Sequence, residues 1–163
     1  MDQLSVNNNN LPVNEDEAKT VATYLQYIVI SLGQEQYGID IRYIDNIVRL
    51  QHITRVPKVP KYLKGVINLR GEVIPVMSLR IKMGLPDDEF SRATRIIILK
   101  TEAEGTIGIL VDEVKEVVTL SDLEIEKTAH GSGKTNFLSG VGKHNNDLIS
   151  LLDLNMITIE DNN

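Results

Sequence analysis

A β-hairpin is predicted by the stretch Gly65-Val-Ile-Asn-Leu-Arg-Gly-Glu-Val-Ile-Pro-Val-Met77, in which two apolar runs flank Arg70-Gly71. Glycine adopts the positive φ that a tight turn requires, so Gly71 marks the turn. Pro75 has no N–H to donate to a neighbouring strand, so we expect a free edge or a bulge at that point. The sequence therefore predicts a two-stranded ribbon with an arginine at its tip.

The residues before this ribbon predict a second hairpin. From Tyr24 to Ser31, residues 25, 27, 29 and 31 alternate with residues 24, 26, 28 and 30, Gly33 opens a turn, and the chain returns over residues 37–41. Apolar residues then fall at helical spacing, which predicts a short helix or helical turn over residues 41–48. These apolar residues are Ile41, Ile44, Ile47 and Val48.

Two prolines and an acidic connector interrupt the middle of the chain. Pro57 and Pro60 favour extended geometry in the residues before them, and Pro60 is placed to begin a one-turn helix through Leu63. After Gly84, residues 86–89 are polar and predict an exposed connector. We place the boundary between two halves of the chain at this connector.

The second half repeats the pattern of short strands. The expected elements are strands over residues 94–100 and 106–112, a capped turn over 121–127, a polar loop over 128–136, a hairpin of 137–141 with 148–152, and a helix over 155–159. Further apolar residues follow the second strand at Val114, Val117, Val118 and Leu120. This spacing predicts an all-β fold of small barrels with short helices. The expected division is a disordered tail over 1–22, one barrel over 23–84 and another over 91–159, with strands free to exchange at the boundary.

Composition restricts the classes of protein that the chain can belong to. It has no cysteine, so disulfides, thiolate metal sites and thiol nucleophiles are excluded. Residues 1–10 lack the basic start and apolar run of a signal peptide, and no apolar stretch approaches the roughly 20 residues of a membrane span. We expect a cytoplasmic protein.

Charge is distributed unevenly along the chain. The formal net charge is −6, but residues 42–82 contain nine Lys or Arg against Asp45 and Glu72, so this segment is +7 and the rest of the chain is −13. An acidic protein argues against non-specific binding to nucleic acid. We therefore expect the basic segment to contact an acidic protein surface.

No motif in the sequence predicts an enzyme, a cofactor or a metal. Gly131-Ser-Gly-Lys-Thr135 resembles part of a phosphate-binding loop, but the position of its first glycine is Thr128, and no long helix follows. His52, His130 and His144 lie in separate segments without metal-ligand spacing, and no Gly-x-Ser-x-Gly elbow is present. A flexible loop and solvated histidines are the better interpretations.

The string Lys64-Gly-Val-Ile-Asn-Leu-Arg-Gly-Glu-Val-Ile-Pro-Val76 resembles the signature of the CheW chemotaxis coupling proteins and of the CheW-like regulatory domain of the histidine kinase CheA. Further segments are similar in order and spacing from about Leu25 to Leu154. They are Tyr37-Gly-Ile-Asp-Ile41, Thr54-Arg-Val-Pro57, Leu79-Arg-Ile-Lys82, Ile107-Gly-Ile-Leu-Val-Asp112 and Phe137-Leu-Ser-Gly-Val141. The resemblance implies two SH3-like five-stranded β-barrels and a non-enzymatic adaptor.

The resemblance also implies which residues contact the partners. The positions that match the family's receptor-binding surface are Ile44, Gly65, Arg70 and Val117, with Asn68, Leu69 and Gly71 framing the arginine. Ile41 and Lys64 match positions that face the regulatory domain of CheA. Where family members often carry a glutamate that pairs with the signature arginine, this chain has Asn46, so Arg70 is expected to use Asn46 as a neutral acceptor or another partner.

Three functions follow from these observations and are distinguishable. The first is an adaptor that joins methyl-accepting chemoreceptor tips to CheA, without inserting into the membrane. The second is a small β-barrel that binds nucleic acid through residues 42–82, although only Tyr43 and Tyr62 in that segment offer rings for base stacking. The third and most remote is a hydrolase that uses His130 or His144.

Overall fold

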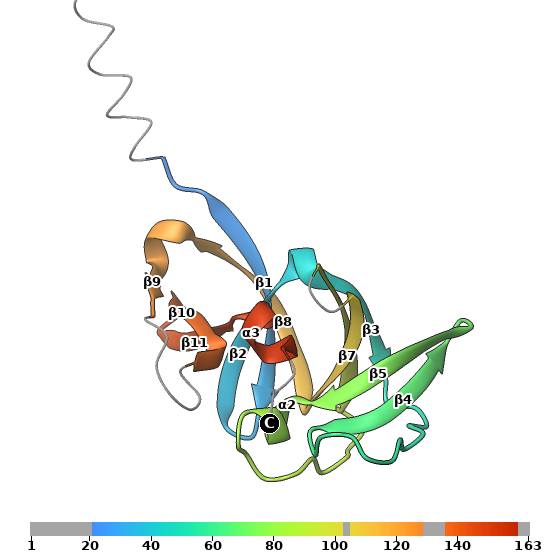
Figure 1. The fold of residues 1–163 in the computed structure, drawn as a ribbon. Coiled ribbons are helices and arrows are strands. Elements are labelled where there is room, and N and C mark those ends of the chain that lie inside the picture. The colour runs from blue at the N-terminus through green and yellow to red at the C-terminus, as the bar shows by residue number, and fades with distance from the viewer. Residues whose placement is uncertain (1–20, 103–104, 129–135, 160–163) are drawn as a thin grey trace, which may run out of the picture.

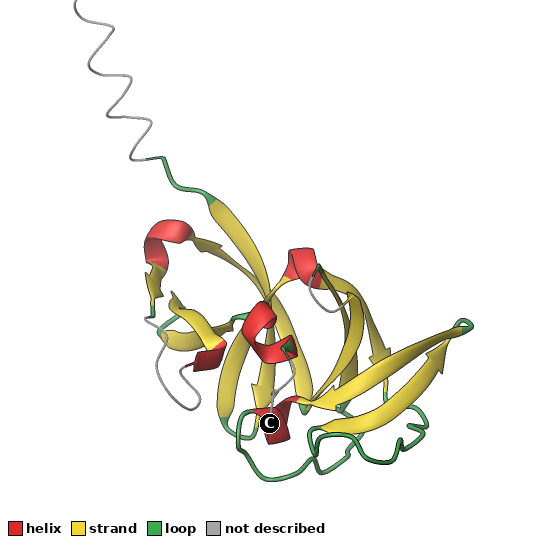
Figure 2. Ribbon diagram, in the orientation of Figure 1, coloured by secondary structure: helices red, strands yellow, loops and turns green. Residues whose placement is uncertain are grey.

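The computed structural model describes residues 21–102, 105–128 and 136–159, and strands are its main secondary structure (Figures 1 and 2). The expected tail over residues 1–22 and the loop over 128–136 therefore lie almost wholly outside the described residues. Among the described residues, four short helical segments have complete bounds. They are the 3-10 turns η1 (Ile41–Tyr43) and η2 (Asp122–Glu124), and the helices α2 (Leu79–Lys82) and α3 (Leu154–Thr158).

The strands form two sheets. The six-stranded sheet has the order β8 (Glu113–Ser121), β1 (Tyr24–Leu32), β2 (Glu35–Asp40), β11 (Asp147–Leu152), β10 (Leu138–His144) and β9 (Ile125–Lys127). The five-stranded sheet has the order β3 (Ile44–Arg49), β6 (Arg95–Thr101), β7 (Gly105–Val111), β5 (Glu72–Ser78) and β4 (Leu63–Leu69). Each sheet therefore takes strands from both sides of the expected boundary at residues 84–91.

Three apolar clusters explain this arrangement. One lies within the six-stranded sheet and includes Val29 and Leu151, and another lies within the five-stranded sheet and includes Ile96 and Leu110. The third and largest contains residues from both sheets, such as Ile30 from β1. Successive residues of a strand point to opposite faces, so a strand between two clusters must be apolar on both faces. The two-barrel fold class is confirmed, with β9 adding a sixth strand to one sheet.

The continuous apolar runs in the sequence are strands of this double-faced kind. In β6, Ile96 and Ile98 point into the five-stranded barrel, while Ile97 and Leu99 point into the cluster shared with the other sheet. All four side chains are essentially inaccessible to solvent. Strand β6 thus holds the barrel together on one face and joins the two sheets on the other.

Most of the predicted elements are confirmed. The hairpins of β1 with β2, β4 with β5 and β10 with β11 all form, and Ser121 with Glu124 makes the expected capping box. The terminal helix forms as α3. The predicted one-turn helix at Pro60 is wrong, because residues 60–63 form only a turn, in which the Leu63 N–H donates to the Pro60 carbonyl at 3.0 Å.

The predicted helix over residues 41–48 is also wrong beyond η1, because residues 44–49 form strand β3. The register of β3 with β6 shifts between Ile44 and Asn46, so Asp45 is an extra residue in a β-bulge. The bulge places Ile44 opposite Leu99 and Ile47 opposite Ile97, on the face that meets the shared cluster. A spacing of three residues on one face, typical of a helix, is here produced by a bulged strand.

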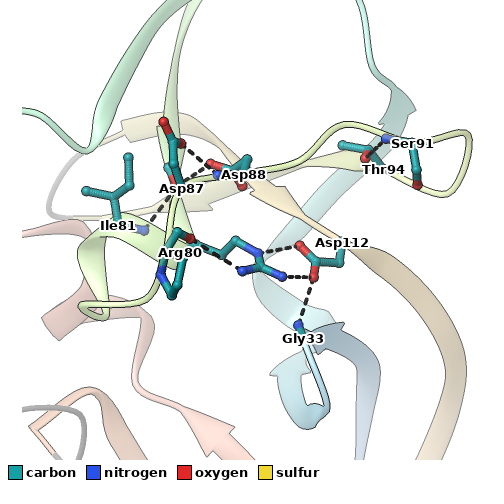
Figure 3. Close-up of polar contacts among 10 residues, drawn as sticks. Gly33, Arg80, Ile81, Asp87, Asp88, Ser91, Thr94 and Asp112 are labelled. Carbon is teal, nitrogen blue, oxygen red and sulfur yellow. Dashed lines mark hydrogen bonds and ion pairs between the residues drawn. The ribbon is translucent and has the colours of Figure 1, made fainter.

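A polar bridge fixes one sheet against the other (Figure 3). Arg80 of α2, which follows the five-stranded sheet at β5, donates to Asp112 through Nε at 2.8 Å and Nη2 at 2.5 Å. Asp112 lies where the chain passes from β7 into β8, and its carboxylate also accepts from the Gly33 N–H at 2.7 Å, in the turn between β1 and β2. The Arg80 guanidinium and the Gly33 N–H hold the pKa of the Asp112 carboxyl below its usual value.

The bridge predicts a pH-dependent loss of stability in Asp112→Asn. Because the pKa of Asp112 is lowered in the folded state, its stabilisation is present above the usual carboxyl pKa and is lost as pH falls through the folded value. We expect the variant to lose about 1–2 kcal/mol in the free energy of unfolding at pH 7, an amount reduced by partial exposure of the pair. Urea unfolding followed by circular dichroism from pH 7 to pH 3 measures this difference.

The difference in the free energy of unfolding between Asp112→Asn and the wild type should shrink towards pH 3. Asp147→Asn, which alters an exposed carboxylate at the start of β11, is the control and should behave like the wild type. A loss in Asp112→Asn that is independent of pH would show that the carboxylate charge does not hold the sheets together.

Candidate protein-interaction site

The hairpin of β4 and β5 carries Arg70 at its tip and projects away from the rest of the molecule (Figure 1). Leu69 pairs with Glu72, so the turn consists of Arg70 and Gly71 alone, with φ of 53° and 83°. Two consecutive positive φ values are typical of a type I′ turn. The Asn68 side chain closes the turn by accepting a hydrogen bond from the Gly71 N–H at 3.0 Å.

The hairpin projects because its neighbours pair with only part of it. On the side of β5, strand β7 pairs only with residues 76–78, so residues 72–75 have no partner there. This is the free edge predicted from Pro75. On the side of β4, a bridge joins Thr54 and Val66 through two backbone hydrogen bonds of 2.8 Å. The four residues from Asn68 to Gly71 are thus presented together beyond the sheet.

Arg70 is not the residue that the turn itself favours. A non-glycine residue with positive φ is strained, and Asn is tolerated there better than Arg. The turn between β10 and β11 has the same two-residue form and uses Asn145 and Asn146, with φ of 48° and 69°. Among the described residues, none forms a hydrogen bond or ion pair with the Arg70 guanidinium. The strain at Arg70 is therefore not relieved by any contact of its guanidinium within the described residues.

Gly65 lies at the base of the hairpin and is buried. Its φ is 143°, and a Cβ added there would collide with the carbonyl of Thr54. The structure therefore gives Gly65 a positioning function, since only glycine lets the strand approach the Thr54 segment closely enough for the bridge to Val66. The register shifts at this point, so Lys64 is the extra residue of a bulge.

The bulge directs Lys64 towards the acidic connector. Its ammonium group lies 2.6 Å from the carboxylate of Asp87 and lowers the pKa of that carboxyl. Lys64 is thus about three-quarters buried and already paired. A partner that uses Lys64 would compete with Asp87 or contact both groups.

Ile44 and Val117 lie on the rim between the two sheets. Ile44 pairs with Leu99 and Val117 with Ile28, and residues that are directly opposite in antiparallel strands share a face of the sheet. Leu99 and Ile28 both belong to the shared cluster. Val117 is 52% exposed and Ile44 is half-buried, so these two side chains extend the cluster towards solvent. Ile41 of η1 packs on the same cluster.

Asn46 does not serve Arg70 as an acceptor. Its side-chain oxygen accepts from the Ile47 N–H at 2.8 Å, and no hydrogen bond joins it to the arginine. The suggested Asn46–Arg70 contact is therefore wrong in this structure. Arg70 is left available for a partner molecule.

The metal, histidine and phosphate-loop candidates of the sequence form no site among the described residues. Within residues 21–102, 105–128 and 136–159, no group of three or more His, Asp or Glu side chains is placed to hold a metal ion. His144 is the last residue of β10 and is partly exposed, with a ring nitrogen 3.3 Å from the Asn145 amide nitrogen. His130 and the Gly131–Thr135 segment lie outside the described residues. No helix in the described chain is both long and apolar enough to span a membrane.

The fold and the exposed hairpin define a small all-β protein made of two packed SH3-like barrels. Residues 26–161 match the model of the CheW-like domain family. The chain therefore belongs to the CheW-like family.

The similarity to known relatives extends over most of this chain and most of each relative. The chemotaxis protein CheW of Bacillus subtilis (strain 168) is 36% identical over 139 residues, which is 84% of this chain and 88% of the relative. The chemotaxis protein CheW of Thermotoga maritima is 33% identical, over 87% of this chain and 95% of the relative. The crystal structure of the scaffolding protein TtCheW from Thermoanaerobacter tengcongensis has a TM-score of 0.77 and 32% identity, and the match covers 83% of this chain and 92% of that one. The family is thus one of chemotaxis scaffold proteins.

The strain at Arg70 predicts that Arg70→Asn stabilises the protein. The variant has Asn-Gly, the preferred pair of a type I′ turn, so we expect the free energy of unfolding to rise by about 0.5–1 kcal/mol. Urea unfolding followed by circular dichroism measures the change. Arg92→Asn, at an exposed arginine outside the hairpin, is the control and should change little. A loss of stability in Arg70→Asn would contradict the account of a strained turn.

Proposed function

We propose that this protein is the adaptor that couples the tips of methyl-accepting chemoreceptors to the histidine kinase CheA. The observation that carries the proposal is the Arg70 guanidinium, which is exposed at the tip of a strained turn and has no partner among the described residues. Arginine offers five donors in a fixed plane and suits recognition of a carboxylate or a backbone carbonyl. The family's chemotaxis scaffolds support this assignment.

The receptor face consists of the hairpin tip and the rim between the sheets. Asn68, Leu69, Arg70 and Gly71 supply the polar part of this face, and Gly65 holds the hairpin in place. Ile44 and Val117 supply the apolar part, against which a helical receptor tip would bury apolar side chains. An apolar contact rimmed by charge is the usual composition of such an interface.

The kinase face includes Ile41 and Lys64. Ile41 is half-buried on the shared cluster, and Lys64 stands on a bulge beside Asp87. The regulatory domain of CheA would meet these positions through the edge of a barrel. Because the chain supplies no chemistry in this mechanism, it alters kinase activity by holding kinase and receptor in a fixed relation. It needs no cofactor and acts in the cytoplasm, joined to receptor arrays by its partners.

Nucleic-acid binding is the weaker alternative, because several cations of the basic segment are already engaged. Arg42 pairs with Asp40 at 2.7 Å, Lys64 with Asp87, and Arg80 with Asp112. Lys82 is buried, donates to the Ile159 carbonyl at 2.8 Å and lies 4.1 Å from the centre of the Tyr62 ring. The positive charge that residues 42–82 can offer to phosphates is therefore smaller than their formal charge of +7.

Arg70→Ala tests the adaptor function directly. We expect the wild type to bind both the CheA regulatory domain and a receptor-tip fragment of the same organism, measured by calorimetry. Arg70→Ala should weaken receptor binding at least about ten-fold, as expected for loss of a hydrogen-bonded arginine in an interface, and leave kinase binding unchanged. Arg92→Ala, at an exposed arginine outside the hairpin, is the matched control.

Two outcomes would contradict the proposal. Failure of the folded wild type to bind either partner would reject the adaptor function. Equal receptor binding by Arg70→Ala and Arg92→Ala would leave the adaptor function standing and reject the receptor face.

A further inference from the structure

A groove separates residues 53–64 from the connector of residues 87–90. Its volume is about 960 Å³, at the upper end of the roughly 300–1,000 Å³ typical of ligand sites. Leu63 and Ile81 contribute apolar surface, and Val56 and Phe90 are 37% and 53% exposed. The groove lies at the base of the hairpin, so it is separate from the tip that carries Arg70.

The groove has an excess of unpaired positive charge. Its two carboxylates are engaged, since Asp87 pairs with Lys64 and Asp88 accepts a hydrogen bond from the Ser78 hydroxyl at 2.5 Å. Three further cations line the groove, namely Arg55, Lys58 and Lys61, and all three are exposed. Within the described part of the chain, none of these three forms an ion pair or a side-chain hydrogen bond.

The turn at Lys58 is strained in the same way as the turn at Arg70. Lys58 has a φ of 62° and follows Pro57, which is the pattern of a type II turn with lysine where glycine or asparagine is usual. The conformation fixes the lysine at the edge of the groove. A basic residue held in a strained turn beside unpaired charge suggests that an anionic group binds there.

The backbone of this segment is also available for pairing. Apart from the turn over residues 56–59, no backbone hydrogen bond joins residues 55–59 to the rest of the chain that the structure describes. Arg55, Val56, Lys58 and Val59 each have an N–H, and Pro57 lacks one. Extended peptides commonly bind through such free backbone groups, while side-chain pockets provide specificity.

We propose that this groove binds an extended acidic segment of a partner protein. The carboxylates of the segment pair with Arg55, Lys58 and Lys61, its backbone pairs with residues 55–59, and its apolar side chains pack between Val56 and Phe90. A peptide fits better than a nucleic acid because Phe90 is the single aromatic ring among the described residues that line the groove, so the groove offers little surface for base stacking.

The experiment uses the full chain and a fluorescein-labelled peptide of alternating Glu-Val-Asp-Leu sequence, eight residues long, with binding followed by fluorescence anisotropy. Arg55→Glu combined with Lys61→Glu should weaken binding at least ten-fold. The matched control combines Lys127→Glu with Lys143→Glu, two exposed lysines on the six-stranded sheet, and should change binding less than two-fold. A peptide with Lys in place of each acidic residue should not bind.

Amide chemical shifts of the full chain, recorded by NMR with the acidic peptide, should change most at Arg55, Val56, Lys58 and Val59. Equal weakening in the two double variants, binding of the basic peptide, or shift changes centred outside the groove would overturn the proposal. Tighter binding of a single-stranded oligonucleotide than of the acidic peptide would also overturn it. So would a ten-fold rise in peptide affinity when Glu15, Asp16 and Glu17 are changed to Gln, since the protein's own tail would then be the occupant.

Discussion

One apolar cluster, buried between the two sheets, decides which strands can pair with each other. Strands β1, β6 and β7 each place alternate side chains in this cluster and in the core of their own barrel. Neither barrel can bury both faces of these strands alone. Exchange of strands across the middle of the chain follows, because β1 and β2 must pair with β8 and β11, while β6 and β7 pair with β3 and β5.

A rigid frame of this kind permits strain at the exposed turns that carry Arg70 and Lys58. Arg70 and Lys58 both occupy positive φ at exposed turns where a smaller residue would be more stable. Burial of the shared cluster and the Arg80–Asp112 bridge offset this local cost. Both strained residues are basic, and both belong to the segment of high positive charge within an acidic protein. Strain at two exposed basic residues is consistent with the proposal that these cations contact acidic or polar partners.

Local signals predicted the hairpins well, since alternation of apolar residues and a turn residue such as Gly33 or Gly71 are sufficient to specify them. The helix over residues 41–48 was predicted wrongly because a bulge at Asp45 gives a strand the spacing of a helix, and a bulge depends on the distant partner β6. The exchange of strands and the Arg80–Asp112 bridge depend on equally distant contacts. The candidate residues at the hairpin tip came from resemblance, whereas the strain at Lys58 has no sequence signal, because lysine seldom adopts positive φ.

Native-state hydrogen exchange of the wild type and Ile97→Ala tests whether the shared cluster makes the two barrels one cooperative unit. Ile97 is fully buried in this cluster, so the substitution should cost about 2–5 kcal/mol. The account predicts that the most protected amides of β1 and β2, and of β6 and β7, exchange with the same free energy and lose the same amount in the variant. Loss of protection confined to the five-stranded sheet, with β1 and β2 unchanged, would contradict it.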